Sequence, residues 1–579
     1  DPMPRTRWFE GSTLNYAEHI FRNKTSERPA LLHRSETTLL KELSWNELEQ
    51  QTVALQAYFR NAGLLPGDRV AACLPNIPEA SVSMLATTAS GAVWSSCSPD
   101  FGAEGIIDRF RQITPRILIM ASGYTYGSRP FNRLEALEKI RKAIPSIETV
   151  IVVPFPGREE EACPEGAVLW QGVMQMQHGS LEFEPVPFAH PLWVLYSSGT
   201  TGMPKAITHS HGGMLLEHFK YLSLHNDVRP GENFFWYSTT GWMMWNLLHA
   251  SLLVGATAVL YEGSPAWPSL DTLWDLAEKA PIHHFGTSAP FLVTCMKKGL
   301  NIREKFPLMS LRSIGSTGSP LPPEVYPYVY KHIREDLWLC SMSGGTDVCT
   351  AWVGSCPWKP VLDGEIQCRC LGVNMQAYDE EGRSLNNEVG EMVVTTPLPC
   401  MPVYFWNDPD YRRYRESYFG YYPGVWRHGD WLQITPQGGV RLLGRSDATL
   451  NRQGVRIGTA EIYRALDKIA EVADSLIVNL ERSGGKDFMP LFIRLAKGAG
   501  LTSDLKSRIR QILRDECSPR HVPDEIIAVP DIPYTISGKK METPVKKILT
   551  GTPPDKAANL SAMRNPDSLD YYAELVNTL

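Results

Sequence analysis

The first part of the chain alternates between segments with helical periodicity and short apolar runs. Ser44-Trp45-Asn46-Glu47 has the form of a capping box and predicts a helix from this point to Gly63. Further helices are predicted over 79–90 and 103–113, and strands over 69–74, around Val93, over 117–120 and over 150–153. This alternation is typical of a mostly parallel sheet with helices on its faces.

The same alternation begins again at Leu192 and continues to Ser341, after a segment rich in Pro, Gly and Glu at 154–166. Strands are predicted near Phe234, Thr257, His284, Ser313 and Trp338. Two consecutive stretches of this kind predict two α/β sheets packed together.

The pattern changes after about Gly364. Turn sequences at 379–382 and 436–439 separate alternating strands such as 391–395 and 440–443, which predicts a smaller β-rich unit. Beyond Gly444 an α+β pattern follows, with helices predicted over 459–469 and 503–516, two strands joined at 483–486, and a strand over 526–529. From Thr550 the chain is expected to lie as a tail on the surface.

Residues 195–205 read Leu-Tyr-Ser-Ser-Gly-Thr-Thr-Gly-Met-Pro-Lys, directly after an apolar run and before a helical pattern. A strand, a loop of small residues and a helix suit phosphate, because glycines let backbone N–H groups approach the oxygens, hydroxyls donate and a lysine supplies charge. It is not the common nucleotide-binding loop, since Gly199 and Gly202 are three apart and Pro204 stands where the second glycine is required. The loop therefore binds phosphate in another fold or is an ordinary polar turn.

Composition narrows the classes of function. With 579 residues the chain is too long for one core, and its net charge of −6 argues against non-specific nucleic-acid binding. The longest apolar stretch, 247–261, is too short to span a bilayer, and no signal peptide is visible, so a cytosolic protein is expected. The eleven cysteines include no C-x-x-C pair, which favours free thiols over a metal site.

Six later motifs turn the loop into part of a larger signature. In order they are Gly318-Ser319-Pro320, Ser343-Gly344-Gly345-Thr346-Asp347, Trp426-Arg427-His428-Gly429-Asp430, Gly444-Arg445-Ser446-Asp447, Gly454-Val455-Arg456-Ile457-Gly458 and Pro533-Tyr534-Thr535-Ile536-Ser537-Gly538-Lys539. Together they resemble the adenylate-forming acyl-CoA synthetases over nearly the whole chain, and 343–347 and 454–461 most resemble members that act on acetoacetate.

The resemblance implies a fold and a division into domains. A large N-terminal domain (1–444) would hold two α/β sheets and a β-barrel, and a small mobile α+β domain (445–549) would turn about a hinge at Asp447. The C-terminal tail would cover 550–579. A hinge is needed because adenylation and thioester formation place different demands on one site.

The resemblance also implies the chemistry. A carboxylate attacks the α-phosphate of ATP, pyrophosphate leaves, and coenzyme A then displaces AMP from the acyl-adenylate. Lys539 resembles the catalytic lysine of adenylation, although a solvated surface lysine beside Lys540 is the alternative. Acetylation of Lys539 would remove its charge and is expected as a regulatory switch.

The nucleotide is expected to meet several of these motifs. Ser197, Ser198, Gly199, Thr200, Thr201, Gly202 and Lys205 would hold the β- and γ-phosphates, Gly318, Ser319 and Pro320 the adenine, Asp430 the ribose hydroxyls, and Arg445 and Arg456 the phosphates. Thr346 would contact the α-phosphate and Asp347 would hold Mg²⁺, a hard cation that prefers oxygen ligands. The family usually carries Glu at the position of Asp347. A capping role for Asp430 and a surface ion pair for Arg456 are the alternatives.

The acyl pocket is expected to be formed by Trp242, Met243, Met244, Thr317 and Gly344, although any of these also fits a core. Acetyl-CoA synthetases carry a Trp where this chain has Gly344, which predicts room for a four-carbon acid such as acetoacetate, butyrate or 3-hydroxybutyrate. The donor for a ketone oxygen is not evident, and an unpaired buried carbonyl is costly. For coenzyme A, Arg109 and Arg514 are expected near the 3′-phosphate, and the loop from Gly454 is expected to reach the site in the second orientation.

Three readings of function compete at this point. The first is a synthetase that joins acetoacetate to coenzyme A, and the second is an adenylating enzyme with another acyl acceptor. The third is a non-catalytic nucleotide-binding module. The presence of Lys539 and Asp430, which match the family's motifs, argues against it. His209 and His211 are expected to be structural, and the protein is expected to act as a monomer on small molecules without a nucleic-acid or membrane partner.

Overall fold

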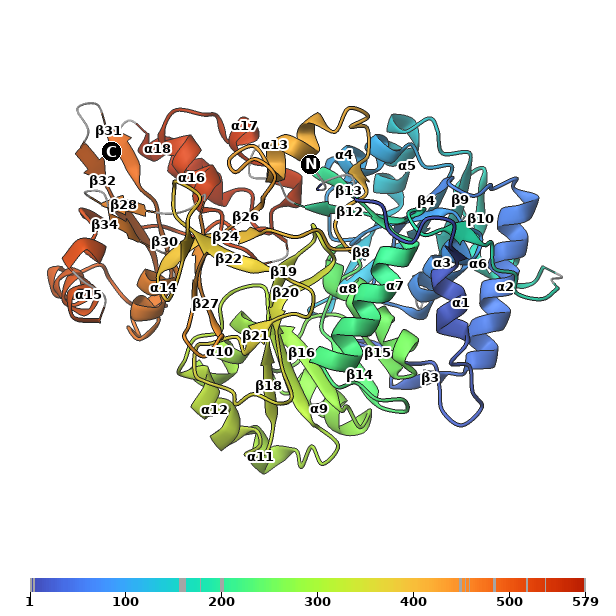
Figure 1. Cartoon of the computed structure of the whole chain (residues 1–579), viewed down its shortest axis with the longest axis horizontal. Coiled ribbons are helices and arrows are strands. Elements are labelled where there is room, and N and C mark those ends of the chain that lie inside the picture. Colours follow the sequence, from blue (N-terminus) through green and yellow to red (C-terminus); the bar gives the residue numbers. More distant parts are fainter. Residues whose placement is uncertain are drawn as a thin grey trace.

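The computed structural model describes residues 3, 6–155, 163–176, 179–197, 203–446, 450–452, 455–457, 459–482, 486–516, 519–536 and 538–576. The first large element is helix α2 (Trp45–Asn61), which begins with the predicted capping box: the Ser44 hydroxyl accepts from Glu47 N–H, and the Glu47 carboxylate accepts from Ser44 N–H. Figure 1 shows the chain as two sheet-containing lobes with a smaller unit beside them.

The predicted first sheet is confirmed and has eight strands. Its order is β10 (Ala167–Leu169), β9 (Thr149–Val153), β6 (Ile117–Ala121), β4 (Arg69–Cys73), β5 (Val93–Cys97), β12 (Pro191–Ser197), β13 (Lys205–Ser210) and β25 (Tyr404–Phe405). The first six are parallel, and β13 and β25 are antiparallel additions. Helices α3 (Pro78–Ala89) and α4 (Ala103–Ile113) fall where the periodicity predicts them.

The second sheet has seven strands, again mostly parallel as predicted. Its order is β18 (Trp338–Ser341), β17 (Ser313–Thr317), β16 (His284–Ser288), β14 (Asn233–Trp236), β15 (Thr257–Glu262), β2 (Leu31–Ser35) and β3 (Lys41–Leu43). Only β3 runs antiparallel to its neighbour. Large aromatic side chains such as Trp94, Trp193 and Trp245 are fully buried in the shared core.

The two sheets meet at the carboxyl ends of their parallel strands. Thr240, in the loop after β14, donates to the carbonyl oxygens of Leu74 (2.6 Å) and Cys97 (3.1 Å), which follow or end β4 and β5. Asn76 N–H donates to the carboxylate of Glu262, the last residue of β15, at 3.2 Å. In parallel α/β sheets ligands bind beyond the carboxyl ends of the strands. A functional site is therefore expected where these ends of the two sheets meet.

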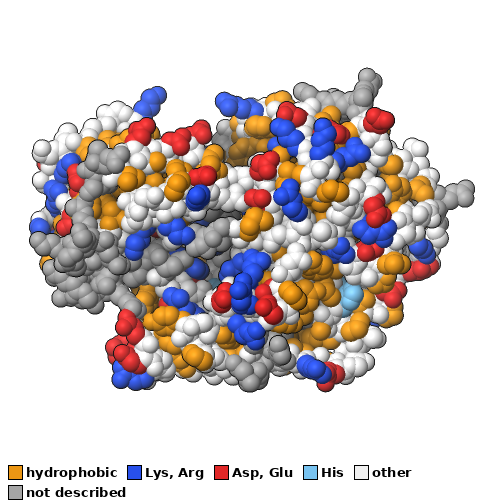
Figure 2. All heavy atoms as spheres, turned by 90° about the horizontal axis from the view of Figure 1, so that it is seen from above, with side chains coloured by type: hydrophobic (Ala, Val, Ile, Leu, Met, Phe, Trp, Pro, Cys, Tyr) orange, Lys and Arg blue, Asp and Glu red, His pale blue; other side chains and the backbone are white. Residues whose placement is uncertain are grey.

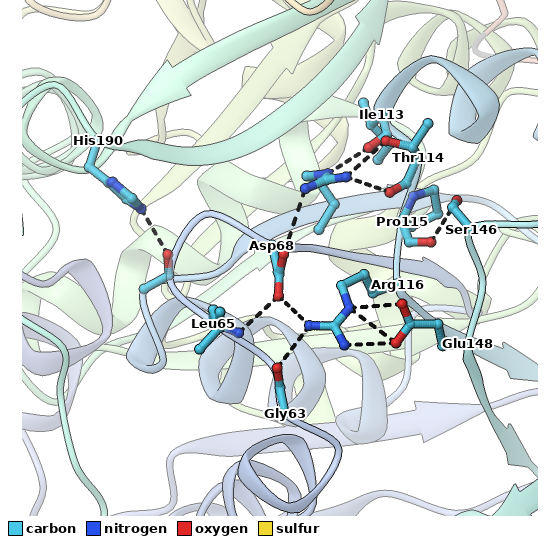
Figure 3. A network of polar contacts seen from close by, with 12 residues as sticks. Gly63, Leu65, Asp68, Ile113, Thr114, Pro115, Arg116, Ser146, Glu148 and His190 are labelled. Atoms are coloured by element: carbon cyan, nitrogen blue, oxygen red, sulfur yellow. Dashed lines mark hydrogen bonds and ion pairs between the residues drawn. The ribbon is translucent and has the colours of Figure 1, made fainter.

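A network of hydrogen bonds and ion pairs lies at the amino-terminal ends of strands in the eight-stranded sheet, opposite the carboxyl ends (Figure 3). Arg116, just before β6, donates to Asp68 (2.7 Å), to Glu148 (2.7 Å) and to Gly63 O (2.8 Å). These residues join the amino ends of β4, β6 and β9. Because the ion pairs are partly exposed, their contribution to the free energy of unfolding is modest, about 1 kcal/mol each or less.

A five-stranded antiparallel sheet follows, in the order β23 (Ser384–Leu385), β22 (Met375–Tyr378), β24 (Val389–Val394), β26 (Trp426–Ile434) and β27 (Val440–Arg445). The resemblance implied a β-barrel here. In the described part of the chain the five strands form one antiparallel sheet, and Ile366 pairs with Val440 of the end strand β27. A separate three-stranded sheet contains β19 (Ser343–Gly345), β20 (Thr350–Gly354) and β21 (Cys368–Arg369).

The C-terminal unit contains a sheet of β30 (Val472–Ile477), β33 (Pro490–Leu495) and β34 (Glu525–Ala528), with helices α14 (Thr459–Asp467), α15 (Ser503–Glu516) and α16 (Glu542–Leu549). The segment after Thr550 is not a surface tail. Leu569 and Tyr572 of helix α18 (Ser568–Leu575) are fully buried in the same cluster as Phe492 of β33. The boundary at 444 stays a prediction.

The C-terminal unit packs against the eight-stranded sheet through its last segment. Asn559 donates to Asp108 of α4 at 3.2 Å, and a Cβ added at Gly105 would lie 2.5 Å from Ser561 Oγ. Ile536, three residues before Lys539, packs against the cluster that contains Phe101 and Phe110. The loop that carries Lys539 therefore borders the N-terminal part of the protein.

Two features of the surface are relevant to partners. Figure 2 shows Lys and Arg side chains interspersed with Asp and Glu on the face seen from above. Among the described helices, none combines the length and the apolar character that crossing a bilayer requires.

Candidate functional site

An ionised carboxylate, Asp347, lies where the two sheets meet. It occupies the turn between β19 and β20, and its Oδ1 accepts a hydrogen bond from the hydroxyl of Tyr418, at the end of helix α13 (Arg412–Tyr418). Lys205 Nζ lies 3.8 Å from the same oxygen and 4.9 Å from the centre of the Tyr418 ring. Burial opposes ionisation, but the charge of Lys205 and the hydrogen bond from the Tyr418 hydroxyl outweigh it and lower the pKa of Asp347.

The two histidines after the phosphate loop are structural in the described contacts, as expected from the sequence. The Nε2 atom of His209 lies 3.0 Å from the carbonyl oxygen of Asp347, and His211 Nδ1 accepts from Tyr16 N–H at 3.1 Å. Both are fully buried, and burial lowers the pKa of His209 to about 4 and that of His211 to about 3. They hold the backbone of the site as neutral rings.

A second carboxylate, Asp430, lies on β26 opposite Arg445 of β27. Arg445 Nη1 is 3.7 Å from Asp430 Oδ1, and His428 Nε2 is 3.5 Å from Asp430 Oδ2. Gly429 adopts φ +88°, and a Cβ at this position would lie 2.9 Å from Arg445 Nη2. Glycine is therefore required here by both the backbone angle and the space for the guanidinium.

The phosphate loop connects two paired strands instead of leading into a helix, which corrects the prediction from its sequence. Ser197 ends β12 and pairs with Lys205, which begins the antiparallel β13; helix α7 (His211–Lys220) starts only after that strand. Ser197 Oγ is buried and has no hydrogen-bond partner among the described residues. Ser198, Gly199, Thr200, Thr201 and Gly202 lie outside the described residues.

The expected adenine segment follows β17 directly. Gly318, Ser319 and Pro320 are exposed, and a Cβ at Gly318 would come within 3.9 Å of the Trp242 ring. Thr317 donates its hydroxyl to Met342 O at 2.9 Å, which ties the end of β17 to the segment leading to Asp347. Thr346 is half-buried beside Asp347.

The structure separates the expected acyl-pocket residues. Trp242 is half-buried just before helix α8 (Met243–Ala250), whereas Met243 and Met244 are 6% and 1% exposed in the main core, which fits the alternative reading of those two residues. The space expected at Gly344 does not lie in the direction of its missing side chain, and its part in an acyl pocket stays a prediction. A Cβ at Gly344 would lie 1.9 Å from Thr350 O of the paired strand β20, so glycine is required there by the strand pairing.

The two arginines expected near the 3′-phosphate of coenzyme A differ in their surroundings. Arg109 is 4% exposed, donates to Gly105 O at 2.6 Å and lies over the ring of Phe101 at 4.3 Å. The expectation that it meets a phosphate at a tunnel mouth is therefore wrong for this arrangement. Arg514 is exposed on α15, a helix that lies on the side of the C-terminal unit away from the two α/β sheets in Figure 1.

The remaining predicted residues belong to the C-terminal unit or its entry. Lys539 is exposed, its N–H donates to Thr535 Oγ1 at 3.0 Å, and its carbonyl accepts from Thr535 N–H at 2.9 Å. Arg456 lies on β29 (Val455–Ile457), opposite Asn451, and its side chain is not among the described atoms. Asp447 and Gly454 lie outside the described residues.

Three residues of the site were missed from sequence. Tyr418 binds Asp347, and His428 lies 3.4 Å from Gly344 O through its Nε2 atom. Gly345 is the third, since a Cβ at this position would lie 3.3 Å from His428 Cε1 and 3.4 Å from Asp347 Oδ2. The position of His428 two residues before Asp430 was the available signal; nothing in the local sequence marks Tyr418.

The described residues contain no cluster of three or more His, Cys, Asp or Glu side chains that could hold a metal ion. A single carboxylate with neighbouring hydroxyls nevertheless fits Mg²⁺, which keeps several waters and is bound by one or two carboxylates together with substrate phosphates. Asp347 meets that requirement because it is ionised and faces Lys205 and the end of β12.

Comparison with known proteins gives the class. Residues 19–405 match the family described as AMP-binding enzyme, which covers more than half of the chain. The fold agrees with that of an anthranilate CoA ligase, AuaEII, solved in complex with anthranoyl-AMP, with a TM-score of 0.78 over 92% of this chain and 97% of that chain at 17% identity. The chain belongs to the AMP-binding enzymes.

Within the AMP-binding enzymes, the chain resembles one group of synthetases over nearly its whole length. An acetoacetyl-coenzyme A synthetase from Rhizobium meliloti (strain 1021) is 44% identical over 99% of this chain and 88% of the relative, and one from Gallus gallus is 42% identical over 98% and 86%. The solved acetoacetyl-CoA synthetase from Streptomyces lividans has a TM-score of 0.95 at 47% identity, over 100% of this chain and 88% of that chain. The chain is therefore a member of the acetoacetyl-CoA synthetase family.

Proposed function

We propose that this protein joins acetoacetate to coenzyme A with ATP, through an acetoacetyl-adenylate, and releases pyrophosphate and AMP. The observation that carries the proposal is the charged group formed by two pairs, Lys205 with Asp347 and Arg445 with Asp430, in which Arg445 also acts electrostatically on Asp347. Full-length similarity to acetoacetyl-CoA synthetases favours acetoacetate and coenzyme A over another acid or another acceptor.

The first step activates a poor electrophile. The substrate carboxylate is already ionised at neutral pH, so no general base is needed before it attacks the α-phosphate. Negative charge then accumulates around phosphorus, and preplaced cations and donors stabilise it. Lys205 and the hydroxyl of Ser197 would hold the leaving pyrophosphate, because Ser197 ends the strand before the loop and Lys205 begins the strand after it.

Asp430 would accept the two ribose hydroxyls, since a carboxylate takes two hydrogen bonds at once. Arg445 lies beside it with its side chain half exposed and would neutralise the phosphates. Thr346 would contact the α-phosphate, and Mg²⁺ held by Asp347 and the phosphates would neutralise charge on the nucleotide when bound. Gly318, Ser319 and Pro320 would contact the adenine.

The second step requires a rearrangement. Lys539, on an exposed loop at the border of the C-terminal unit, would stabilise the adenylation transition state and then withdraw. Rotation about Asp447 would bring the segment of Gly454 and Arg456 to the site for attack by coenzyme A, with Arg514 near its 3′-phosphate. We further propose that acetylation of the exposed Lys539 blocks adenylation, and that the protein acts in the cytosol as a monomer.

A panel of acids tests the function. Acetate, butyrate, acetoacetate and 3-hydroxybutyrate are compared by acid-dependent exchange of labelled pyrophosphate into ATP and by coenzyme A-dependent release of AMP. We expect acetoacetate to give the highest kcat/KM in both assays. Exchange without coenzyme A-dependent AMP release would indicate another acceptor, and a preference for acetate or butyrate would reject acetoacetate as the substrate.

A further inference from the structure

The described site assigns charged groups to phosphates and ribose but names no partner for the ketone oxygen of a β-keto acid. A buried carbonyl without a donor costs roughly 1–3 kcal/mol, so a pocket selective for such an acid needs one. His428 is the candidate. It lies on β26, its side chain is 5% exposed, and it stands between Asp347 and Asp430.

The proton of His428 has a defined position. Trp352 Nε1 donates to His428 Nδ1 at 3.2 Å, and an indole N–H is a donor only, so Nδ1 is the unprotonated nitrogen. The two rings meet edge to face, with centroids 5.7 Å apart and an interplanar angle of 81°, which holds the imidazole in place. With Nδ1 accepting from the indole, the neutral ring carries its proton on Nε2.

Among the described residues, that Nε2–H makes only long contacts. It lies 3.4 Å from Gly344 O and 3.5 Å from Asp430 Oδ2, whereas N–H···O hydrogen bonds are usually about 2.7–3.2 Å long. A better acceptor placed nearby would therefore gain a full hydrogen bond from this atom.

The ring edge is left uncovered by Gly345. A Cβ at this position would lie 3.6 Å from His428 Nε2 and 3.4 Å from Asp347 Oδ2, so the absent side chain faces both groups. Any larger residue would stand over the donor. The glycine that opens this part of the site is thus Gly345, since Gly344 is held against Thr350 of the neighbouring strand.

We infer that His428 Nε2–H donates to the ketone oxygen of the acetoacetyl group and makes His428 a specificity-determining residue. The inference rests on the proposed function. In the acyl-adenylate the acyl carbon is joined to the α-phosphate through the former carboxylate oxygen, and the ketone carbon lies two bonds further along the chain. A donor between the carboxylate assigned to Mg²⁺ and the one assigned to ribose is close to that junction. A neutral N–H suits a neutral carbonyl, whereas the nearby phosphates have Lys205 and Arg445.

The test compares acetoacetate with butyrate, which has the same chain length and lacks the ketone. kcat/KM for AMP formation is measured at saturating ATP and coenzyme A. In His428→Leu the ratio of kcat/KM for acetoacetate over butyrate should fall about 10- to 100-fold, because the ketone alone loses its donor. His428→Gln, whose amide N–H reaches nearly as far as Nε2, should recover part of the ratio.

Trp352→Phe provides a second and independent measurement. It removes the N–H that fixes the tautomer while keeping a ring in place, and we expect an intermediate fall in the same ratio. Thermal unfolding identifies variants that are not folded. If His428→Leu does not fold, the acetoacetate-to-butyrate ratio of kcat/KM in His428→Gln and Trp352→Phe tests the inference.

Two results would overturn the inference. Equal losses for both acids would mean that His428 acts on the phosphate or ribose, and an unchanged ratio in folded variants would mean that it does not touch the ketone. Failure of the proposed function looks different, because the unmodified protein itself would then show no preference for acetoacetate.

Discussion

Lys205 Nζ and Asp347 Oδ1 lie 3.8 Å apart, although the two residues belong to different sheets. Lys205 begins β13 of the eight-stranded sheet, and Asp347 lies in the turn between β19 and β20 of the three-stranded sheet. Tyr418 contributes a third segment, with its hydroxyl on Asp347 and its ring beneath the ammonium. The charge at the centre of the site thus depends on how the sheets pack.

Tyr418→Phe should weaken the site for Mg²⁺. The hydroxyl donates to the charged carboxylate, so its removal raises the pKa of Asp347 and frees its orientation. Hydrogen bonds to charged groups contribute about 1.5–3 kcal/mol, and we expect the Mg²⁺ concentration for half-maximal activity to rise roughly tenfold or more. Tyr414→Phe is the matched control, since Tyr414 lies in the same helix and aromatic cluster. Equal shifts in both variants would contradict the assignment.

Lys539→Ala should separate the two half-reactions. Loss of one cation from the adenylation transition state is expected to slow pyrophosphate exchange roughly 10²–10³-fold. Thioester formation from preformed acetoacetyl-adenylate should change less than threefold. Lys540→Ala is the control, because Lys540 pairs with Asp474 at 2.9 Å and lies over the ring of Tyr463. We expect that variant to lower the melting temperature and to keep adenylation. A similar loss in both half-reactions of Lys539→Ala would refute its role.

Gly344→Ala and Gly345→Ala should behave differently. A methyl at Gly344 would overlap the backbone of Thr350, so we expect overpacking to destabilise the protein by about 1–3 kcal/mol. A methyl at Gly345 meets only side chains at 3.3 Å or more and should leave the melting temperature nearly unchanged. It should lower the preference for acetoacetate, as expected if it crowds His428. Thermal unfolding and the acetoacetate-to-butyrate ratio, measured on both variants, provide the check.

Buried neutral histidines should make the fold sensitive to acid. Burial lowers the pKa of His209, His218 and His249 to about 4 and that of His211 to about 3. Below about pH 6.5 the unfolded chain binds protons that the folded protein does not, so the free energy of unfolding falls as the pH drops from 6.5 toward 4. Each histidine contributes at most about 1.4 kcal/mol per pH unit.

The melting temperature measured between pH 7 and pH 5 checks this, with His249→Gln as the informative variant. His249 lies 2.7 Å from Ser81 Oγ through Nε2 and 2.8 Å from Trp245 O through Nδ1, away from the site. The variant should be less stable at pH 7 and show a shallower fall with acid. An identical slope would exclude His249 as a contributor.

Local patterns in the sequence were sufficient for most elements. The helix over 103–113 has the bounds that the periodicity predicts, and the capping box at Ser44 and Glu47 forms as expected. These predictions hold because a helical face or a buried strand is specified by residues a few positions apart. The order of the motifs was also enough to indicate the family, since each motif is a short segment.

The tertiary structure determined which residues of those segments contact one another. Arg109 is buried against Phe101, and the loop before Lys205 joins two antiparallel strands instead of a strand and a helix. Of two adjacent glycines, Gly344 is held against a neighbouring strand and Gly345 faces His428 and Asp347. The direction of a missing side chain depends on strand pairing between distant segments. The residue types of the site were therefore set by sequence, but the partners of Asp347 and the open edge of His428 exist only once the sheets have packed.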